Sequence, residues 1–166
     1  MTVSSFNTVT LHPKPVISFN VQHPSETLLA LQSSTRFVVH LLAPSAAAAR
    51  LARDFARGNQ NLELGEFEWE FPRDNNNNNS LPRLRRRRQQ HSLEDKKEGE
   101  DFGFVLECQY LPDKTIQVYG HMVVLGTVEK VLSASSRSSD RSNHEGHDFC
   151  LTYADTRFWK MGEQVE

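Results

Sequence analysis

The sequence predicts a mostly β domain, a small β-barrel with a few helices. Segments rich in β-branched and aromatic residues recur along the chain and are separated by turn residues. Only two segments read as helices, which is too few for a parallel sheet with a helix at each crossover. The length of 166 residues suits one domain, so residues 1–166 are expected to form a single domain.

Strands are expected in at least six places along the chain. The first two, residues 2–11 and 15–21, flank the turn signal His12-Pro13-Lys14. Further apolar or alternating runs predict strands over residues 36–42, 102–110, 115–132 and 149–154. An aromatic-rich stretch, residues 151–162, lies near the C-terminus, and its rings would either close the barrel or stack on a planar ligand.

Two helices are expected, over residues 25–33 and from about residue 44 to residue 58. The second has apolar side chains at i, i+3, i+4 and i+7, which form one stripe able to pack on a sheet. These side chains are Ala48, Leu51, Ala52 and Phe55. Gly58 is a natural stop, because the residue that follows a helix often adopts the left-handed conformation.

The composition excludes several classes of protein. The net charge of −2 argues against a surface that is basic throughout, as a general nucleic-acid or membrane binder would need. Cys108 and Cys150 lack metal-binding spacing, the histidines form no ligand set, and no metal is expected. No apolar run reaches the ~18 to 20 residues of a membrane span, so we expect a cytoplasmic protein, or a mitochondrial one if a segment precedes Met1.

Two segments dilute the hydrophobic content to 37%. Residues 72–101 contain Asn75–Asn79 and Arg85–Arg88 and are expected to be a disordered insertion, since they offer little apolar area to offset the cost of ordering. Residues 133–147 are rich in serine and are expected to be a flexible loop. The arginine run is interpreted as part of a solvated loop; a nucleic-acid-binding patch is the alternative.

The first candidate site is the hydroxyl-rich opening of the chain. Alternation along a strand would place Thr2 and Ser4 on one face and Ser5 on the other, so that both faces mix polar with apolar residues. A strand with only a core role would separate them. The alternative is an exposed terminal strand with small polar side chains.

The second candidate is the start of the first helix. Ser25 is placed to cap it and Thr27 falls in its first turn, so two hydroxyl groups and unpaired backbone N–H groups meet at a positive helix end. Such an end binds phosphate readily. The alternative is that Ser25 only caps the helix.

The third candidate is His121, which follows Gly120 within the expected strand over residues 115–132. A glycine inside a strand often marks a bulge, and a bulge can redirect the next side chain toward a ligand. An imidazole there could donate hydrogen bonds to a cofactor or titrate near neutral pH. The alternative is a half-buried histidine with a structural role.

Taken in chain order, these segments resemble the flavin reductase-like family, whose fold is an FMN-binding split barrel. The matching segments are residues 2–13 (TVSSFNTVTLHP), 16–21 (VISFNV), Ser25-x-Thr27, 37–42 (FVVHLL), 54–56 (DFA), 106–108 (LEC), 120–128 (GHMVVLGTV) and 151–153 with Arg157-Phe158. The resemblance covers most of the chain outside the two polar segments.

The resemblance implies an oxidoreductase that transfers hydride from NADH or NADPH to a flavin, and it implies a homodimer with the flavin at its interface. The expected flavin is FMN, with FAD as the alternative. Thr2, Ser4 and Ser5 would then bind the ring and the ribityl chain, and Ser25 and Thr27 the phosphate. His121 would lie where the nicotinamide docks and is the catalytic candidate.

Two departures from the family pattern affect this expectation. Gly120 stands where the family has an aspartate beside the histidine. Met1 lies one residue before the first motif, whereas family members have a preceding segment that includes the first barrel strand, so we expect a split barrel that is incomplete at its N-terminus. The alternative function is therefore a flavin-binding protein without competent turnover.

Overall fold

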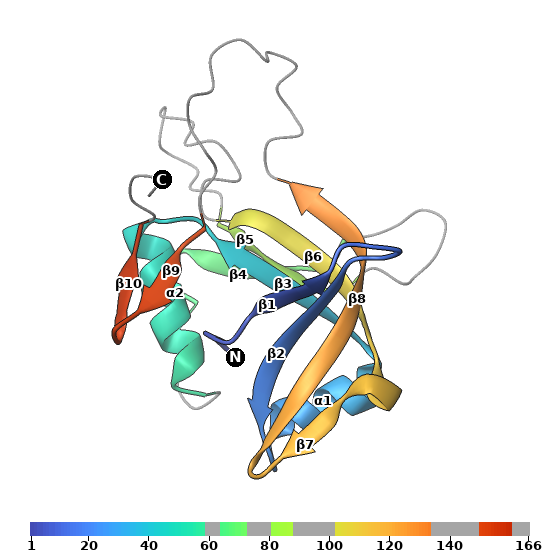
Figure 1. Ribbon diagram of the computed structural model, residues 1–166. Helices are drawn as coiled ribbons and strands as arrows, with labels where there is room; N and C mark the ends of the chain where they lie inside the picture. Colours follow the sequence, from blue (N-terminus) through green and yellow to red (C-terminus); the bar gives the residue numbers. More distant parts are fainter. Residues whose placement is uncertain (59–63, 73–80, 88–101, 134–149, 161–166) are drawn as a thin grey trace, which may run out of the picture. The chain divides into compact units, whose positions relative to one another are not determined.

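The computed structural model describes residues 1–58, 64–72, 81–87, 102–133 and 150–160, shown as ribbon in Figure 1. The chain divides into two compact units. Unit 1 comprises Met1–Val39, Pro72–Leu81 and Leu106–Val131, and unit 2 comprises His40–Phe71, Pro82–Val105 and Leu132–Glu166. Strands β3 (Arg36–Leu42) and β6 (Phe102–Tyr110) contribute residues to both units.

The largest sheet has six strands, in the order β1-β2-β8-β6-β3, with β7 paired to β8. Its other members are β1 (Asn7–Thr10), β2 (Val16–Gln22), β7 (Ile116–Val118) and β8 (His121–Ser133). A short 3₁₀ helix, Pro112–Lys114, precedes β7. Strand β2 pairs antiparallel with β1 and β8, and β7 pairs antiparallel with β8. The prediction of a mostly β fold is confirmed.

The core of unit 1 is built on alternation along β2. Ile17, Phe19 and Val21 are buried and point to one face, while the residues between them point to the other. Helix α1 (Glu26–Ser34) adds Leu28 and Leu31 to the buried residues. The other buried apolar residues of unit 1 are Leu106, Cys108, Tyr110 and Val124.

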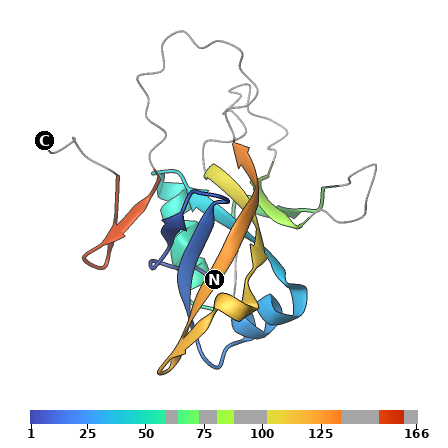
Figure 2. The ribbon, with the colours of Figure 1, turned by 45° about the vertical axis from the view of Figure 1, so that its right-hand side comes forward.

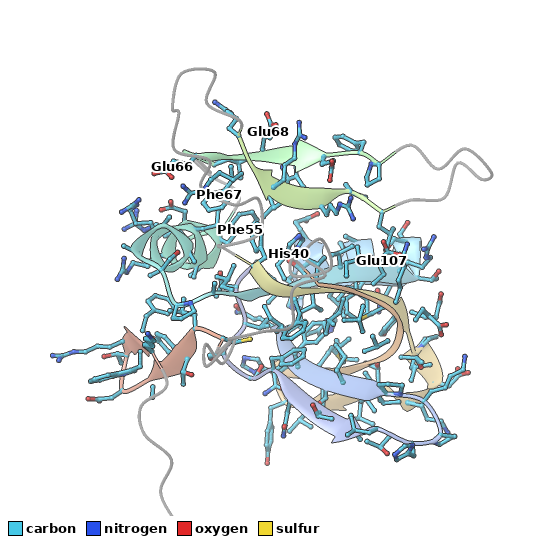
Figure 3. The ribbon with its side chains drawn as sticks, turned by 90° about the horizontal axis from the view of Figure 1, so that it is seen from above. His40, Phe55, Glu66, Phe67, Glu68 and Glu107 are labelled. Carbon is cyan, nitrogen blue, oxygen red and sulfur yellow. The ribbon has the colours of Figure 1, made fainter. Side chains whose placement is uncertain are left out.

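Unit 2 contains helix α2 (Ala46–Ala56) and two hairpins. One hairpin pairs β4 (Phe67–Glu70) with β5 (Arg83–Arg86), and the other pairs β9 (Thr152–Ala154) with β10 (Arg157–Trp159). The predicted apolar stripe of α2 is confirmed, since Ala48, Leu51 and Ala52 are buried and Phe55 is partly buried against the core. The core cluster of unit 2 consists of Leu51, Phe67, Leu84 and Phe102, and Figure 3 shows Phe55 and Phe67 coming from α2 and β4.

The outer face of the β4–β5 hairpin is a ladder of opposite charges. Nε of Arg83 lies 2.7 Å from Oε2 of Glu70, and an Nη atom of Arg85 lies 2.7 Å from Oε1 of Glu68. The register places these residues directly opposite one another across the two strands. Cross-strand pairs of opposite charge stabilise a hairpin, so the arginines of β5 are ion-paired within unit 2.

The expected disordered insertion over residues 72–101 is wrong for its central part. Residues 83–86 form β5, and the side chain of Leu84 is buried. Alternation explains this, because one apolar residue between arginines suffices to anchor a short strand when its partner strand carries glutamates at the facing positions. Residues 73–80 and 88–101, like residues 134–147 of the expected serine-rich loop, lie outside the described part of the chain.

Three expected strands differ from those observed. The first begins only at Asn7, so residues 2–6 are not in a strand. The strand expected over residues 115–132 is a hairpin, with β7 and β8 joined by a turn at Tyr119 and Gly120. The strand expected over residues 149–154 is shorter, and β9 pairs only with β10 among the described strands, so it does not extend the six-stranded sheet. No helix in the described ranges is long and apolar enough to cross a membrane.

Candidate functional site

A cavity of about 280 Å³ lies in unit 1, beside the N-terminal segment. It is lined by Met1, Thr2, Val3, Ser4, Ser5, Asn20, Gln22 and His121. Four of the residues predicted for the site, Thr2, Ser4, Ser5 and His121, therefore share one cavity although His121 is more than a hundred residues away in the sequence. The side chains at the site come from the N-terminal segment, β2 and the start of β8.

The N-terminal segment is held along β2 without being part of its ladder. The pairing of β1 with β2 begins at Asn7, opposite Ser18, and continuing that antiparallel register would place Ser5 opposite Asn20. At this position the backbone N–H of Asn20 donates a 2.8 Å hydrogen bond to Oγ of Ser5. A side chain thus replaces the missing ladder bond, and the backbone of residues 2–6 is free to diverge and form a wall of the cavity.

The opposite wall is the outer face of β2 and β8. Asn20 and Gln22 alternate with the buried Phe19 and Val21, so their side chains lie on the exposed face. His121 pairs with Gln22 across the two strands and lies on the same face. This alternation brings two amides and an imidazole to the cavity.

The turn before His121 fixes the position of the imidazole. Val118 pairs with His121, so Tyr119 and Gly120 form a two-residue hairpin connection. The turn between the yellow-orange β7 and the orange β8 lies at the bottom of the view in Figure 2. The backbone N–H of His23 donates a 2.9 Å hydrogen bond to the carbonyl of Gly120. The expected bulge at Gly120 is therefore wrong: Gly120 belongs to a turn, and His121 is the first residue of β8.

The cavity is polar and nearly free of charged side chains. None of its eight lining residues is an aspartate, glutamate, lysine or arginine. Burial lowers the pKa of the Met1 α-amino group below its ordinary value. Hydroxyl and amide groups can donate and accept hydrogen bonds without titrating, so this lining suits an uncharged, polar ligand group. Among the described residues, no cluster of three or more His, Cys, Asp or Glu could hold a metal ion.

Ser25 and Thr27 do not line the cavity. Oγ of Ser25 accepts a 3.3 Å hydrogen bond from the backbone N–H of Leu28, which is the capping role given as the alternative. The residue between them, Glu26, adds a negative charge in the first turn and weakens the attraction of this helix end for an anion. Ser25 is nevertheless only three residues after Gln22, a distance of at most about 11 Å along the chain.

Among the described side chains, the two with strongly shifted pKa values do not line the cavity. Burial and the charge of Arg83 lower the pKa of His40 to about 4, and Nε2 of His40 accepts a 3.0 Å hydrogen bond from the backbone N–H of Leu84. Burial, with the charges of Glu107 and Glu129, raises the pKa of the Cys108 thiol to about 12. Both groups are neutral at physiological pH, and their roles are structural.

The sequence reasoning missed Asn20 and Gln22. Both are polar residues that alternate with apolar ones in an expected strand, and this pattern alone identifies an exposed face, which is common in antiparallel sheets. Asn20 and Gln22 differ from other exposed strand residues because the N-terminal segment lies beside them at the cavity. Predicting them as site residues would have required knowing that β2 pairs with β8, which brings His121 beside Gln22.

Comparisons with known proteins identify the family and the fold. A family model described as a flavin reductase like domain matches residues 1–161. The structure is similar to the flavin reductase of styrene monooxygenase from Pseudomonas putida, with a TM-score of 0.65, 17% identity, and coverage of 99% of this chain and 82% of that one.

Two further structures share the fold. An NADH:FAD oxidoreductase from Streptomyces globisporus, in complex with NAD and FAD fragments, has a TM-score of 0.62 and 17% identity, with coverage of 100% of this chain and 79% of that one. A protein from Sinorhizobium meliloti has a TM-score of 0.55 and 19% identity. There the match covers 79% of this chain but only 37% of the other, so this chain spans little more than a third of that relative.

Proposed function

This chain belongs to the flavin reductase-like family, and on that premise we propose that it transfers hydride from NADH or NADPH to a flavin. The observation that carries the proposal is the cavity itself, because it joins the N-terminal hydroxyl groups to His121 in one polar pocket. None of these side chains belongs to the buried apolar core of unit 1. Together they offer hydrogen-bonding groups on two sides of one cavity, which suits the binding of a polar planar ring.

The lining residues fit the ring system of a flavin. The polar edge of the isoalloxazine carries carbonyl and N–H groups, and Thr2, Ser4 and Ser5 offer hydroxyl groups that can pair with both kinds. Oγ of Ser5 already accepts a bond from Asn20, and its hydroxyl hydrogen can still donate to a ligand. We assign these three residues to the ring and the ribityl chain.

We assign the phosphate to Ser25 and Thr27 at the start of α1. The helix has nine residues, and its first turn presents backbone N–H groups and the positive end of the helix dipole. Its closeness to Gln22 along the chain supports one ligand that reaches both places. FMN ends in the phosphate that such a site would take, and FAD would extend further.

The nicotinamide is assigned to the face beside His121. A bound flavin would supply the redox chemistry, since its ring can take up a hydride, that is, one proton and two electrons, from a reduced nicotinamide. The chain's residues bind and orient the two rings, and His121, exposed at the start of β8, can donate a hydrogen bond to the incoming nicotinamide. No lining residue has to act as a nucleophile.

We propose that the active form is a homodimer. The cavity of about 280 Å³ is slightly smaller than the usual range for ligand pockets, about 300 to 1,000 Å³, and so it encloses only part of a flavin. A second copy of the chain would complete the enclosure. Light scattering coupled to size-exclusion chromatography should give twice the mass of the chain, and a monomer that binds flavin fully would contradict this.

The experiment that tests the function has two stages. Purified protein is first titrated with FMN and with FAD while flavin fluorescence is followed, and the complex is then mixed anaerobically with NADH or NADPH. We expect quenching on binding, followed by loss of the oxidised-flavin absorbance. The matched variant is His121→Gln, which should retain flavin binding and slow the reduction.

Two other outcomes have distinct meanings. Protein that binds flavin but is not reduced by either nucleotide would favour a flavin-binding protein without turnover. Gly120 supports this second candidate, because a glycine has no side chain that could hold the imidazole of His121 in place. Protein that binds neither FMN nor FAD would overturn both functions.

A further inference from the structure

An apolar edge adjoins the polar cavity on the same face of the sheet. Ile116 and Val118 of β7 are 58% and 44% exposed, respectively. Strand β7 pairs only with β8 among the described strands, so its far edge has no neighbour in the sheet. Two branched apolar side chains on an exposed three-residue strand contribute little to the core, and their position relative to the cavity suggests another role.

The strand register places these side chains in line with the cavity residues. Val118 pairs with His121, which pairs with Gln22 on its other side. Because directly opposite residues of antiparallel strands point to the same face, these three form one row across the sheet.

A second row runs parallel to the first. Ile116 pairs with Val123, and Val123 pairs with Asn20, whose backbone is bonded to Ser5. Each row therefore changes from polar side chains on β2 to apolar ones on β7, and His121 lies in the middle of this change. We call the surface formed by Ile116, Val118 and Val123 the apolar shoulder of the cavity.

The dimensions of the rows suit a fused ring system. Neighbouring strands lie about 4.8 Å apart, so β2 and β7 are separated by about 10 Å. This span is comparable to the length of three linearly fused six-membered rings. A ligand that covered both ends would need one hydrogen-bonding end and one apolar end.

We infer that the apolar shoulder binds the dimethylbenzene end of the flavin ring, and that the ring's hydrogen-bonding end faces Ser5, Asn20 and Gln22. The inference rests on the proposed function and goes beyond it by fixing which end of the ring lies at which wall. It makes Ile116 and Val118 specificity-determining residues, which favour a flavin with apolar substituents over one with polar or absent substituents at that end.

The shoulder is preorganised for this contact. The side-chain amide of Gln117 donates a 3.2 Å hydrogen bond to the carbonyl of Tyr119, and His23 bonds the carbonyl of Gly120, so both turn residues are held. Tyr119 has a backbone φ of 50°, a conformation that residues other than glycine rarely adopt. A fixed turn keeps Val118 beside His121 before a ligand arrives, which lowers the entropy cost of binding.

The test compares two flavins and two kinds of variant. The flavins are FMN and its analogue without the two ring methyl groups, and each dissociation constant is measured by fluorescence quenching. The double variant Ile116→Thr with Val118→Thr keeps a β-branched side chain at both positions. Threonine replaces a methyl group by a hydroxyl group at Val118, and an ethyl group by a hydroxyl group at Ile116. The control is Val131→Thr, an exposed apolar residue further along β8.

We expect the wild-type protein to bind FMN about three to ten times more tightly than the analogue, the effect of burying one or two methyl groups. The double variant should bind FMN about three to ten times more weakly than the wild type, with the analogue changed less than about twofold. The control should match the wild type for both flavins. The comparison of flavins on the wild-type protein needs no variant to fold.

Several results would overturn the inference. Equal affinities of the wild type for the two flavins, or equal weakening of both in the double variant, would place the methyl-bearing end elsewhere. A double variant that dissociates into monomers while it still binds FMN normally would assign the shoulder to contact between copies. In each case FMN binding by the wild type keeps the proposed function intact, whereas no binding of FMN or FAD by the wild type would remove both.

Discussion

Oγ of Ser5 accepts a 2.8 Å hydrogen bond from the backbone N–H of Asn20, at the point where the pairing of β1 with β2 has ended. One hydroxyl group thereby satisfies a strand donor and holds the N-terminal segment against β2. The same contact links a wall of the cavity to its opposite face. The hydroxyl of Ser5 is therefore expected to position the segment as well as to bind a ligand.

Replacing Ser5 by alanine should weaken flavin binding while the protein stays folded. The variant loses one exposed hydrogen bond, worth about 0.5 to 1.5 kcal/mol in stability, and frees the segment that carries Thr2 and Ser4. We expect at least a roughly fivefold rise in the FMN dissociation constant, measured by fluorescence quenching. Ser5→Thr keeps the hydroxyl group and should restore most of the affinity, and alanine binding as well as serine would refute the positioning role.

Gly126 has no room for a side chain. A Cβ atom there would lie 2.5 Å from Cζ of Phe37, whose ring also packs edge-on against Phe19 at a centroid distance of 5.5 Å. Gly126→Ala should therefore destabilise the protein by about 1 to 3 kcal/mol, the usual cost of overpacking, as measured by urea denaturation.

A matched substitution and a double variant control this prediction. A Cβ on Gly103, also in a strand, would meet only ordinary contacts at 3.6 and 3.8 Å, so Gly103→Ala should change stability by less than about 0.5 kcal/mol. Phe37→Leu combined with Gly126→Ala should recover part of the loss, since the ring that causes the clash is removed. Purely additive effects would mean that the two sites do not interact.

His40 should make the protein sensitive to acid. Its pKa is about 4 in the folded state against 6.5 ordinarily, so the unfolded chain binds the proton first as the pH falls. The stability is complete above about pH 6.5 and is lost progressively down to about pH 4, by up to about 3 kcal/mol. Protonation of His40 would also remove the acceptor for the N–H of Leu84.

The measurement is the free energy of unfolding as a function of pH. His40→Gln retains an acceptor for Leu84 and should flatten the curve between about pH 4 and 6.5. His12→Gln, at an exposed turn, is the matched control and should follow the wild type. If His40→Gln and the wild type lose stability in parallel, another group controls the acid transition.

Leu84 tests whether β5 is a structural strand. The residue is buried in a cluster with Phe67 and Phe102, so Leu84→Ala should cost about 2 to 5 kcal/mol in the free energy of unfolding. Arg87→Ala, three residues later and mostly exposed, should stay within about 0.5 kcal/mol of the wild type. If Leu84→Ala left the free energy of unfolding unchanged, residues 83–86 would not form a structural strand, and the predicted disordered insertion would include them.

Much of the secondary structure could be predicted because it depends on local pattern. The bounds of β3 and β6 and the cap of α2 at Ser45 follow from apolar runs and from a capping serine. The failures have a common cause. The two-residue turn at Tyr119 and the strand of Arg83–Arg86 depend on a partner strand, and pairing partners are not visible in a segment read alone.

Residue types and their alternation were enough to predict the fold class and the hydrogen-bonding chemistry of the N-terminal segment, because both depend on local composition. Tertiary structure alone decided which of these groups meet. The ladder between β2 and β8 brings His121 to Gln22, the ladder between β7 and β8 adds Val118, and the bond from Asn20 to Ser5 closes the wall. Register is a relation between distant strands, and a shift of one residue would turn each of these side chains to the other face of the sheet.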